Sequence, residues 1–204
     1  MHGLAKGSRV LVPDGKKPIE AIRVGDYVLS CSEIDSVKPE FKRVVKTVMH
    51  EAQTIFDISI APENWSFPDP LHLLVATGDH PFWVEGNGWT SAYKLKPGQR
   101  LRQGDGKFAL ISGVTPVYRT GKDGIGWHPS TKSMDSRGTV FNYANNALAS
   151  EEDEKQFVFL PQEVLNSGDP FLRVPVYNFE VEDFHTYYVG GKLGYLTHDS
   201  RFEP

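Results

Sequence analysis

Apolar and polar residues alternate most clearly near the C-terminal end of the chain. Residues 174–181 have the sequence VPVYNFEV, in which the two kinds of side chain alternate over much of the run. This two-residue period predicts a β-strand. After a polar bend at Glu182-Asp183, a second β-rich run, TYYV, occupies residues 186–189. Gly190-Gly191 then turns the chain toward residues 193–197, so we expect a strand followed by a hairpin.

Short strands and tight turns are also expected through the first half of the chain. Val10 and Val12 alternate with their neighbours and are followed by Pro13-Asp14-Gly15, a sequence suited to a turn. Nineteen Gly and fourteen Pro, together with twelve Phe and eight Tyr, fit many short strands joined by turns. The pattern therefore predicts an all-β fold. Further strands are expected within residues 24–30, 41–47, 54–61 and 73–84.

The segment 114–172 has a less regular pattern and is expected to be a variable insertion. Residues 120–138 are rich in Gly, Ser, Asp and Lys, which predicts a long loop. Residues 144–155 (ANNALASEEDEK) fit either a short helix or an acidic surface loop. Strands are expected at 114–119, 139–143 and 157–160.

Length and charge narrow the classes of protein and partner. A chain of 204 residues fits one domain with a sizeable apolar core. The net charge of −4 gives no basic surface for nucleic acid or for anionic membrane, and no apolar run approaches the roughly 20 residues that span a bilayer. A single cysteine, Cys31, excludes an internal disulfide and favours a reducing, intracellular compartment. Cys31 is expected to be a small buried core residue.

Three blocks of sequence carry a family resemblance. The first is GSRVLVPDG at 7–15, continued by PIEAIRVGDYV; the second is TGDHPFWV at 77–84; the third is VYNFEVEDFHTYYVGG at 176–191, continued to THDS at 197–200. In this order they resemble a Hint (hedgehog/intein) self-processing domain, either a mini-intein or a bacterial-intein-like domain. The resemblance implies a horseshoe-shaped disc with pseudo-two-fold halves. It also implies a domain at 3–199 without a homing endonuclease, flanked by residues 1–2 and 200–204.

The resemblance also implies a site at the two ends of the domain. In the family, a first cysteine attacks the preceding carbonyl in an N-to-S acyl shift, and a threonine and a histidine assist. The acyl group then moves to the residue after the domain, and the last residue of the domain cyclises with the help of two histidines. The corresponding positions here are Gly3, Thr77, His80, His185, His198, Asp199 and Ser200.

Two of these positions depart from the family pattern. Gly3 stands where the cysteine nucleophile is expected, and Asp199 stands where the cyclising asparagine is expected. The acyl shift therefore lacks its usual start, and cleavage after Asp199 is expected to be slow near neutral pH. Retained flanks would make the chain a trapped precursor, with Gly3 an engineered replacement. Asn178 occupies a position where many inteins have Asp, and it is expected to satisfy backbone groups in a strand.

Two functions from different classes remain open on sequence grounds. The chain is either a single-turnover domain that splices or cleaves its own flanking segments, or a Hint-like module that has lost activity and acts as a scaffold or binding domain. No cofactor is required, the chain is expected to be a monomer, and its partners are its own flanks. Zinc is a weak alternative, as an inhibitory ligand of His80, His185 and His198. The other histidines, His2, His50, His72 and His128, are expected to be ordinary surface or core groups.

Overall fold

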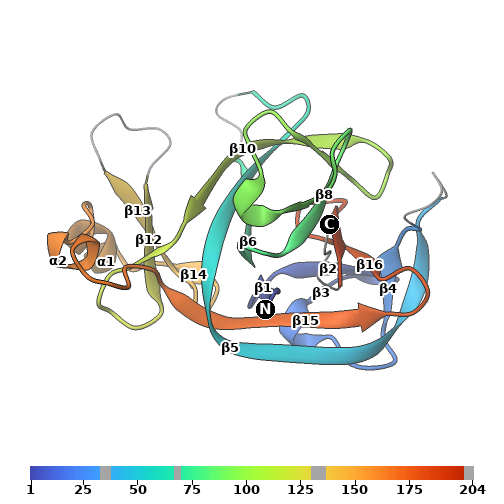
Figure 1. Ribbon diagram of the computed structural model, residues 1–204, viewed down its shortest axis with the longest axis horizontal. Coiled ribbons are helices and arrows are strands. Elements are labelled where there is room, and N and C mark those ends of the chain that lie inside the picture. Colours follow the sequence, from blue (N-terminus) through green and yellow to red (C-terminus); the bar gives the residue numbers. More distant parts are fainter. Residues whose placement is uncertain (33–37, 67–69, 130–136, 200–204) are drawn as a thin grey trace.

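The computed structural model describes residues 1–32, 38–66, 70–129 and 137–199. Most of the strand residues belong to one large sheet, and a smaller sheet forms a lobe at one end of the elongated molecule (Figure 1). The pairings between described strands are antiparallel, as expected for short strands joined by tight turns. The predicted all-β class is therefore confirmed.

The large sheet is assembled from both ends of the chain. Its order is β15-β1-β6-β5-β10-β9-β7-β17-β16-β2-β3, with β4 paired to β5 and β8 paired to β7. Two 3-10 helices, η1 (Ile19–Ala21) and η2 (Ala92–Lys94), connect strands of this sheet. The strands are β1 (Leu4–Ala5), β2 (Arg9–Val12), β3 (Gly15–Pro18), β4 (Tyr27–Ser30), β5 (Glu40–Pro62), β6 (His72–Thr77), β7 (Pro81–Val84), β8 (Gly88–Ser91), β9 (Arg100–Arg102), β10 (Phe108–Pro116), β15 (Arg173–Val181), β16 (Thr186–Val189) and β17 (Tyr195–His198).

The long strand β5 connects the parts of this sheet. Its first half, from Val44 to Thr54, pairs with β15, and the two strands run side by side along the lower edge of the view in Figure 1. Its second half pairs with β6 and β10. Ala52, at φ +49°, adopts a left-handed conformation near the point where the partner changes. One strand therefore serves two sets of neighbours by bending between them.

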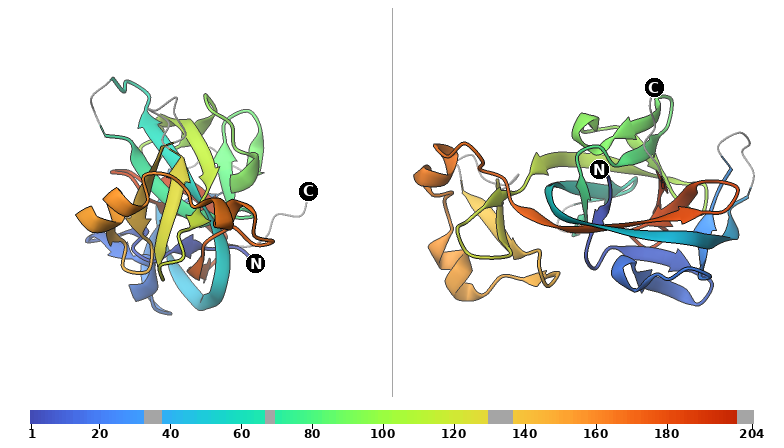
Figure 2. Two further views of the ribbon diagram at one scale, coloured as in Figure 1. Left: turned by 90° about the vertical axis from the view of Figure 1, so that its left-hand side faces the viewer. Right: turned by 60° about the horizontal axis from the view of Figure 1, so that its bottom comes forward.

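The two-residue strand β1 closes a circuit of strands. Leu4 pairs with Tyr177 of β15 on one side and with Ala76 of β6 on the other. Because β5 pairs with both β6 and β15, the four strands form a ring. The start of β1 is thereby held between β15 and β6, whereas the exposed Met1 lies at the N label in Figures 1 and 2.

The expected pseudo-two-fold halves are present as a repeated unit. A hairpin, a 3-10 turn, a tight turn and a strand occur as β2-β3-η1-β4 and again as β7-β8-η2-β9. The tight turn is closed by Asp26 N–H on Arg23 O in the first unit and by Gln99 N–H on Lys96 O in the second. The unit recurs because the same order of turn residues and apolar positions occurs twice in the sequence.

Each tight turn has a glycine at its third position with positive φ. Gly25 lies at φ +95° and Gly98 at φ +86°, as the third residue of a type II turn requires. Gly25 N–H donates to Val44 O over 2.9 Å, and Gly98 N–H donates to Ile111 O over 2.8 Å. Each turn is thus tied to a neighbouring long strand, β5 in one half and β10 in the other.

The insertion forms the smaller lobe, seen at the left of Figures 1 and 2 (right). Its apolar centre is formed by Ile125, Trp127, Val140 and Phe157. The lobe contains β11 (Tyr118–Arg119), β12 (Ile125–Pro129), β13 (Gly138–Asn142), β14 (Ala147–Leu148), α1 (Glu151–Gln156) and α2 (Gln162–Leu165).

Two expectations for the insertion were wrong. β12 lies inside the segment 120–138 that was expected to be a loop, since Ile125 and Trp127 supply apolar contacts among the turn-forming residues. Residues 157–160, expected to be a strand, instead follow α1, whose N-terminus is stabilised by a capping box between Ser150 and Asp153. The remaining part of this segment, 130–136, lies outside the described residues.

The lobe is connected to the large sheet at two places. At its base, Leu172 N–H donates to Val117 O over 2.9 Å, so the chain leaves and returns at adjacent points. Beside it, the buried Asp57 of β5 accepts a hydrogen bond from Tyr143 Oη over 2.8 Å and lies 3.4 Å from His128 Nε2. Burial raises the pKa of the Asp57 carboxyl. A polar cluster thus joins β5 to the lobe.

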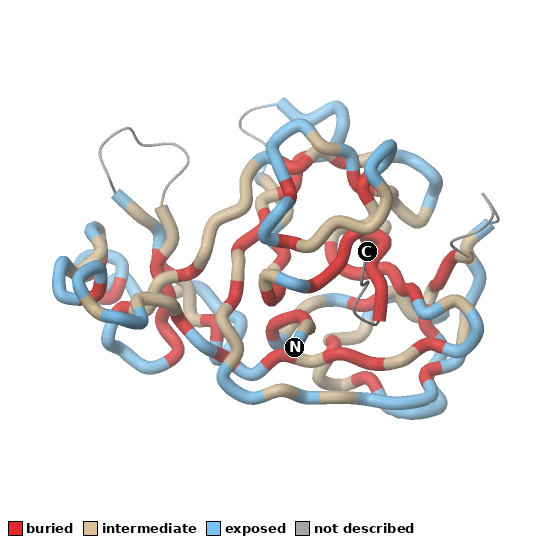
Figure 3. Tube along the Cα trace, viewed as in Figure 1, coloured by how far each residue is buried: buried red, intermediate tan, exposed pale blue. Residues whose placement is uncertain are grey.

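The main core fills the space between the two repeated halves. Its largest fully buried side chains include Phe82, Phe179, Tyr187 and Tyr195, which come from four different strands. Figure 3 shows where buried stretches of the chain gather. The centre of the molecule is therefore a closely packed support for the ends of the chain.

Along the described residues, no helix has the length and apolar character needed to cross a membrane.

Replacing either turn glycine tests the repeated unit. We expect Gly25→Ala and Gly98→Ala each to lower the free energy of unfolding by about 1–2 kcal/mol, because alanine is strained at positive φ. A Cβ at either position meets no atom within 4 Å, so the loss reports backbone strain alone. The exposed Gly168, which has neither positive φ nor a close neighbour, is the matched control, and Gly168→Ala should change stability by less than about 0.5 kcal/mol. Urea denaturation measures all three, and equal losses at Gly168 and the turns would contradict the assignment.

Candidate functional site

The first junction of the domain lies between β15 and β6. Gly3 N–H, which belongs to the peptide bond between residues 2 and 3, donates to Thr77 Oγ1 over 3.1 Å. In return, Thr77 N–H donates to Gly3 O over 2.9 Å. Thr77 itself is buried at the end of β6. The threonine therefore holds the peptide unit at which an acyl shift would occur.

Gly3 fits its place because it has no side chain. A Cβ at this position would lie 2.9 Å from the carbonyl oxygen of Tyr177 and 3.1 Å from a methyl group of Val176. Because the nearer atom belongs to the backbone, any larger residue at position 3 requires β1 to move away from β15. The chain thus has neither a nucleophile here nor room for one without a small rearrangement.

His80 is fully buried, and its hydrogen bonds define its tautomer. Its Nε2 lies 2.7 Å from Thr197 Oγ1, and this hydroxyl donates its single hydrogen to Pro81 O. Nε2 must therefore be the donor to Thr197, which leaves Nδ1 without a proton in the neutral ring. Burial holds the pKa of His80 well below its usual range, so the ring is neutral at pH 7. Among the described residues no hydrogen-bond partner reaches Nδ1.

The carbonyl group of the second junction accepts two hydrogen bonds. Asp199 O, the oxygen of the peptide unit that leads to residue 200, lies 2.8 Å from Asn178 Nδ2 and 3.0 Å from His2 Nε2. The Asn178 donor comes from β15 and the His2 donor from the segment before β1. Two donors on one carbonyl oxygen polarise the C=O bond, which favours attack on its carbon.

The amide of Asn178 has one possible orientation. Its Oδ1 accepts hydrogen bonds from Phe179 N–H over 2.9 Å and from Tyr187 Oη over 3.0 Å. Because the backbone N–H can only donate, Oδ1 must face it and Nδ2 must face Asp199 O. The side chain expected only to satisfy backbone therefore also contacts the second junction.

The Asp199 carboxyl group is buried among donors. Oδ2 accepts from Val181 N–H over 2.7 Å and lies 3.3 Å from His185 Nδ1. Oδ1 has no hydrogen bond from a described residue and lies 3.6 Å from His198 Nδ1. Burial raises the pKa of Asp199 to about 6, and the hydrogen bond from Val181 opposes this increase. One carboxyl oxygen is fixed and the other faces a histidine.

His185 and His198 are held beside this carboxyl group by the last hairpin. Thr186 of β16 pairs with His198 of β17, and Asp199 N–H donates to His185 O over 2.8 Å. The two imidazole rings are stacked with centroids 6.3 Å apart, and Trp89 lies edge-on to His198 at 5.0 Å. His185 adopts φ +55°, which is uncommon for a residue other than glycine and is found at sites under strain.

The structure brings the two junctions to one centre. His2 connects them, because its ring contacts Asp199 O and lies 6.0 Å from the ring of His80. Thr77, His80, His185, His198 and Asp199 surround this centre, whereas Ser200 lies outside the described residues. The interpretation of His2 as an ordinary surface or core group does not account for its contact with Asp199.

Three contacts with the site were not predicted from the sequence, and they involve His2, Asn178 and Thr197. Thr197 lies next to His198 but contacts His80, 117 positions away. Asn178 and His2 lie 21 and 197 positions from Asp199. Only Asn178 carried a signal, because it stands in a family motif where a carboxylate is common.

The zinc interpretation has no support in the geometry. Within the described ranges, no group of three or more His, Cys, Asp or Glu side chains is placed to bind a metal ion. His185 and His198 approach each other and Asp199, but His80 is turned toward Thr197. His80, His185 and His198 therefore do not form the ligand set that was considered.

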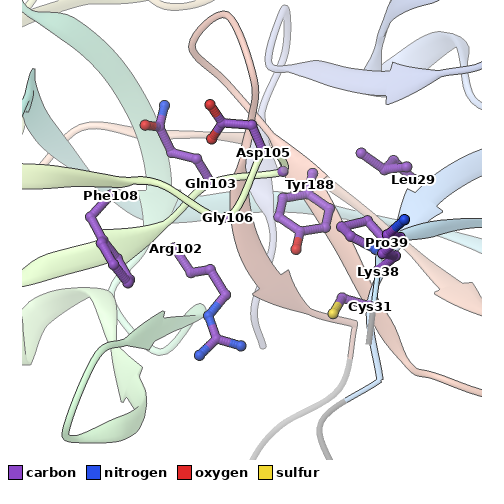
Figure 4. Close-up of a pocket in the computed structure, with 11 residues that line it drawn as sticks. Leu29, Cys31, Lys38, Pro39, Arg102, Gln103, Asp105, Gly106, Phe108 and Tyr188 are labelled. Carbon is purple, nitrogen blue, oxygen red and sulfur yellow. The ribbon is translucent and has the colours of Figure 1, made fainter. Parts of the chain in front are cut away.

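A cavity of about 570 Å³ lies apart from this centre (Figure 4). Its lining includes Cys31, Arg102, Phe108 and Tyr188, and none of the junction residues takes part. Cys31 is buried and packs with Tyr188 and Leu196, as expected for a small core residue. The volume of this cavity therefore gives no guide to the chemistry at the ends of the chain.

Comparisons with known proteins agree with the fold. The sequence profile of the pretoxin HINT domain matches residues 9–116. The solution structure of a bacterial intein-like domain from Clostridium thermocellum is 22% identical, with a TM-score of 0.61 over 97% of this chain and 99% of that chain. A DnaB intein from Synechocystis sp. PCC 6803 is 11% identical, with a TM-score of 0.58 over 98% and 99%. The zinc-bound splicing domain of the Msm DnaB1 intein is 17% identical, with a TM-score of 0.54 over 96% and 98%.

No curated protein matches this chain. The matched profile covers more than half of the residues, and the solved structures share the arrangement of strands. Such a fold supports autoprocessing in general. The chain belongs to the pretoxin HINT domain family, a group of Hint domains.

Proposed function

We propose that this domain cleaves its own chain after Asp199 in a single turnover. The proposal depends on one observation, the two hydrogen bonds from Asn178 and His2 to the carbonyl oxygen of Asp199, with the side chain of Asp199 buried beside them. Intramolecular attack requires hydrogen-bond donors on the carbonyl oxygen and a nucleophile on the same residue. The family name associates such domains with pretoxins, and this cut would free the polypeptide that follows.

The proposed reaction is a hydrolysis in two steps. A carboxylate oxygen of Asp199 attacks the carbonyl carbon of the same residue and closes a five-membered anhydride. The bond to the nitrogen of residue 200 breaks, and that nitrogen leaves as an amine after it gains a proton. Water then opens the anhydride and restores Asp199 with a free C-terminal carboxyl group. One water molecule is consumed for each peptide bond cleaved.

Oδ1 is the better placed oxygen for this attack. Oδ2 is engaged by Val181 N–H, whereas Oδ1 accepts no hydrogen bond from a described residue. His198 Nδ1, 3.6 Å from Oδ1, is in position to assist proton movement near the reacting group. His185, whose side chain is 59% exposed, connects the site with solvent and can exchange protons with it.

Neither the nucleophile position of the first junction nor His80 takes part in this reaction. Gly3 has no nucleophilic side chain, and the neutral, buried His80 has no proton on Nδ1 to give to a leaving amide nitrogen. Cleavage rather than splicing is therefore the outcome that this chain supports.

Zinc would act only as an inhibitor, by binding to His185 or His198. Addition of a chelator should therefore not lower the rate of release.

A scaffold without activity is the competing function. Gly3 in place of the nucleophile favours it, because a domain without the first step has no need of the rest. The buried Asp199 opposes it, since retention of a carboxyl group with a raised pKa costs stability and a scaffold gains nothing from it. Release of the C-terminal segment distinguishes the two functions.

The side chain at position 199 controls the rate of release. Asp199→Asn should release the peptide Ser-Arg-Phe-Glu-Pro faster than the parent chain, because the amide nitrogen closes a stable succinimide instead of an anhydride. Asp199→Ala, which has no nucleophile, should release none. His198→Ala or His185→Ala added to Asp199→Asn should slow release by about a hundredfold, a typical loss for general acid–base assistance. Mass spectrometry at neutral pH follows the peptide.

The control for these variants is Asp183→Asn. Asp183 is a nearby exposed carboxylate with a positive φ that asparagine tolerates, and it pairs with Lys42 away from the carbonyl. Its replacement should leave the rate unchanged. If Asp199→Asn released the peptide at the same rate with and without both histidines, the cleavage would be spontaneous asparagine cyclisation without help from the domain.

The pH profile identifies the protonation state that reacts. The carboxylate of Asp199 is the nucleophile and its pKa is about 6, so release should fall about tenfold per pH unit as the pH drops below 6. The Asp199→Asn variant should lack the part of this decrease that comes from the carboxylate, because its amide does not titrate in that range. Initial rates from pH 4.5 to 7.5 provide the comparison. A rate that rises steadily toward acid in the parent chain would indicate ordinary acid hydrolysis instead.

Restoring a thiol tests the first junction. Gly3→Cys should produce cleavage before residue 3 that added thiol accelerates, because a thioester there is open to exchange. The new side chain must displace β1 slightly from Tyr177 O, so folding is verified by the near-UV spectrum. His80→Ala in this background should slow cleavage by about a hundredfold, because the unprotonated Nδ1 of His80 can accept the proton of the new thiol. Absence of thiol-dependent cleavage in a folded Gly3→Cys chain would favour the scaffold.

A further inference from the structure

The residue before the first junction contacts the reacting group of the second. His2 precedes β1, and its Nε2 lies 3.0 Å from Asp199 O across 197 positions of sequence. The pairing of Leu4 with both β15 and β6 fixes the direction in which the preceding residues leave β1. The ring of strands that holds Gly3 therefore also places His2 beside the residue that follows β17.

The chemistry of this contact allows only one direction for the hydrogen bond. A carbonyl oxygen has no proton, so Nε2 of His2 must be the donor. The ring is therefore either the neutral tautomer with the proton on Nε2 or the imidazolium ion. In both forms a positive hydrogen points at the oxygen on which negative charge develops when the Asp199 carbonyl carbon is attacked.

The geometry points to His2 as a catalytic residue for cleavage after Asp199, supplied by the segment upstream of the domain. His2 and Asn178 together form an oxyanion site, with Asn178 held by the domain and His2 held by the flank. This inference rests on the proposed cleavage. It adds that the upstream flank determines the rate at the downstream junction.

The inference has a consequence for the order of events. The His2–Gly3 peptide bond is the first junction, so cleavage there would separate the His2 donor from the domain. A chain that lost its upstream segment would keep only the Asn178 donor on Asp199 O. Cleavage after Asp199 is therefore fastest while the upstream segment is attached, which a glycine at position 3 ensures.

Substitution of His2 tests whether its ring accelerates cleavage after Asp199. His2→Ala should slow release of Ser-Arg-Phe-Glu-Pro from the full chain by about tenfold to a hundredfold, less than the loss for a fully buried oxyanion donor because this contact is partly exposed. His2→Gln, which offers an amide N–H, should recover part of the rate. His50→Ala, a histidine of β5 whose backbone pairs with Val176 rather than with a junction residue, should leave the rate unchanged.

A spectroscopic measurement separates this inference from the proposed cleavage. The ¹⁵N spectrum of the His2 ring reports whether Nε2 carries a proton, and the ¹³C signal of the Asp199 carbonyl should shift in His2→Ala if the bond is lost. A protonated Nε2 and a slower His2→Ala chain support the role. A bare Nε2, or release from His2→Ala at the parent rate, overturns it while leaving the cleavage itself intact. No release from the parent or from Asp199→Asn would overturn the cleavage, and the ring spectrum would still decide the contact.

Discussion

The pairing of β1 with two neighbours is the constraint on which the site depends. Through Leu4, this short strand joins β15 to β6 and completes the ring that β5 closes on the other side. Without it, the edges of β6 and β15 would have unpaired backbone groups in the interior. The same pairing fixes Gly3 against Thr77 and sends His2 toward Asp199. The same strand pairing therefore closes the fold and brings the two ends of the domain together.

The buried carboxyl group of Asp199 lowers the stability of the domain at neutral pH. Its pKa rises from 3.8 to about 6, which corresponds to about 3 kcal/mol between the two protonation states. The stabilising effect of the protonated form is complete below the unfolded pKa and is lost as the pH rises through about 6. The hydrogen bond from Val181 and the proximity of His185 offset part of this cost. A group kept in this state is more consistent with reactivity than with support of the fold.

Local patterns in the sequence determined the class of the fold, and the family resemblance of three motifs indicated most of the residues considered for the site. The alternation in 174–181 predicted β15, and the family resemblance predicted the two halves that the structure shows as a repeated unit. β12 was missed because Ile125 and Trp127 lie among residues typical of loops, and only the lobe's packing selects a strand there. The contacts of His2, Asn178 and Thr197 were missed because they join distant positions, and no periodicity records which carbonyl oxygen a side chain will face.

The hydrogen bond between Leu172 and Val117 sets the base of the lobe, and it also defines an exchangeable unit. Since the chain leaves β10 and re-enters β15 at neighbouring points along β5, another polypeptide whose ends lie close together can occupy that place, provided that it covers Ile55 and pairs with the buried Asp57 as Tyr143 of the lobe does. Residues 118–171 are therefore a natural acceptor position for a sensor or receptor module. A designer could graft such a module there and leave the strands that position Asp199 untouched.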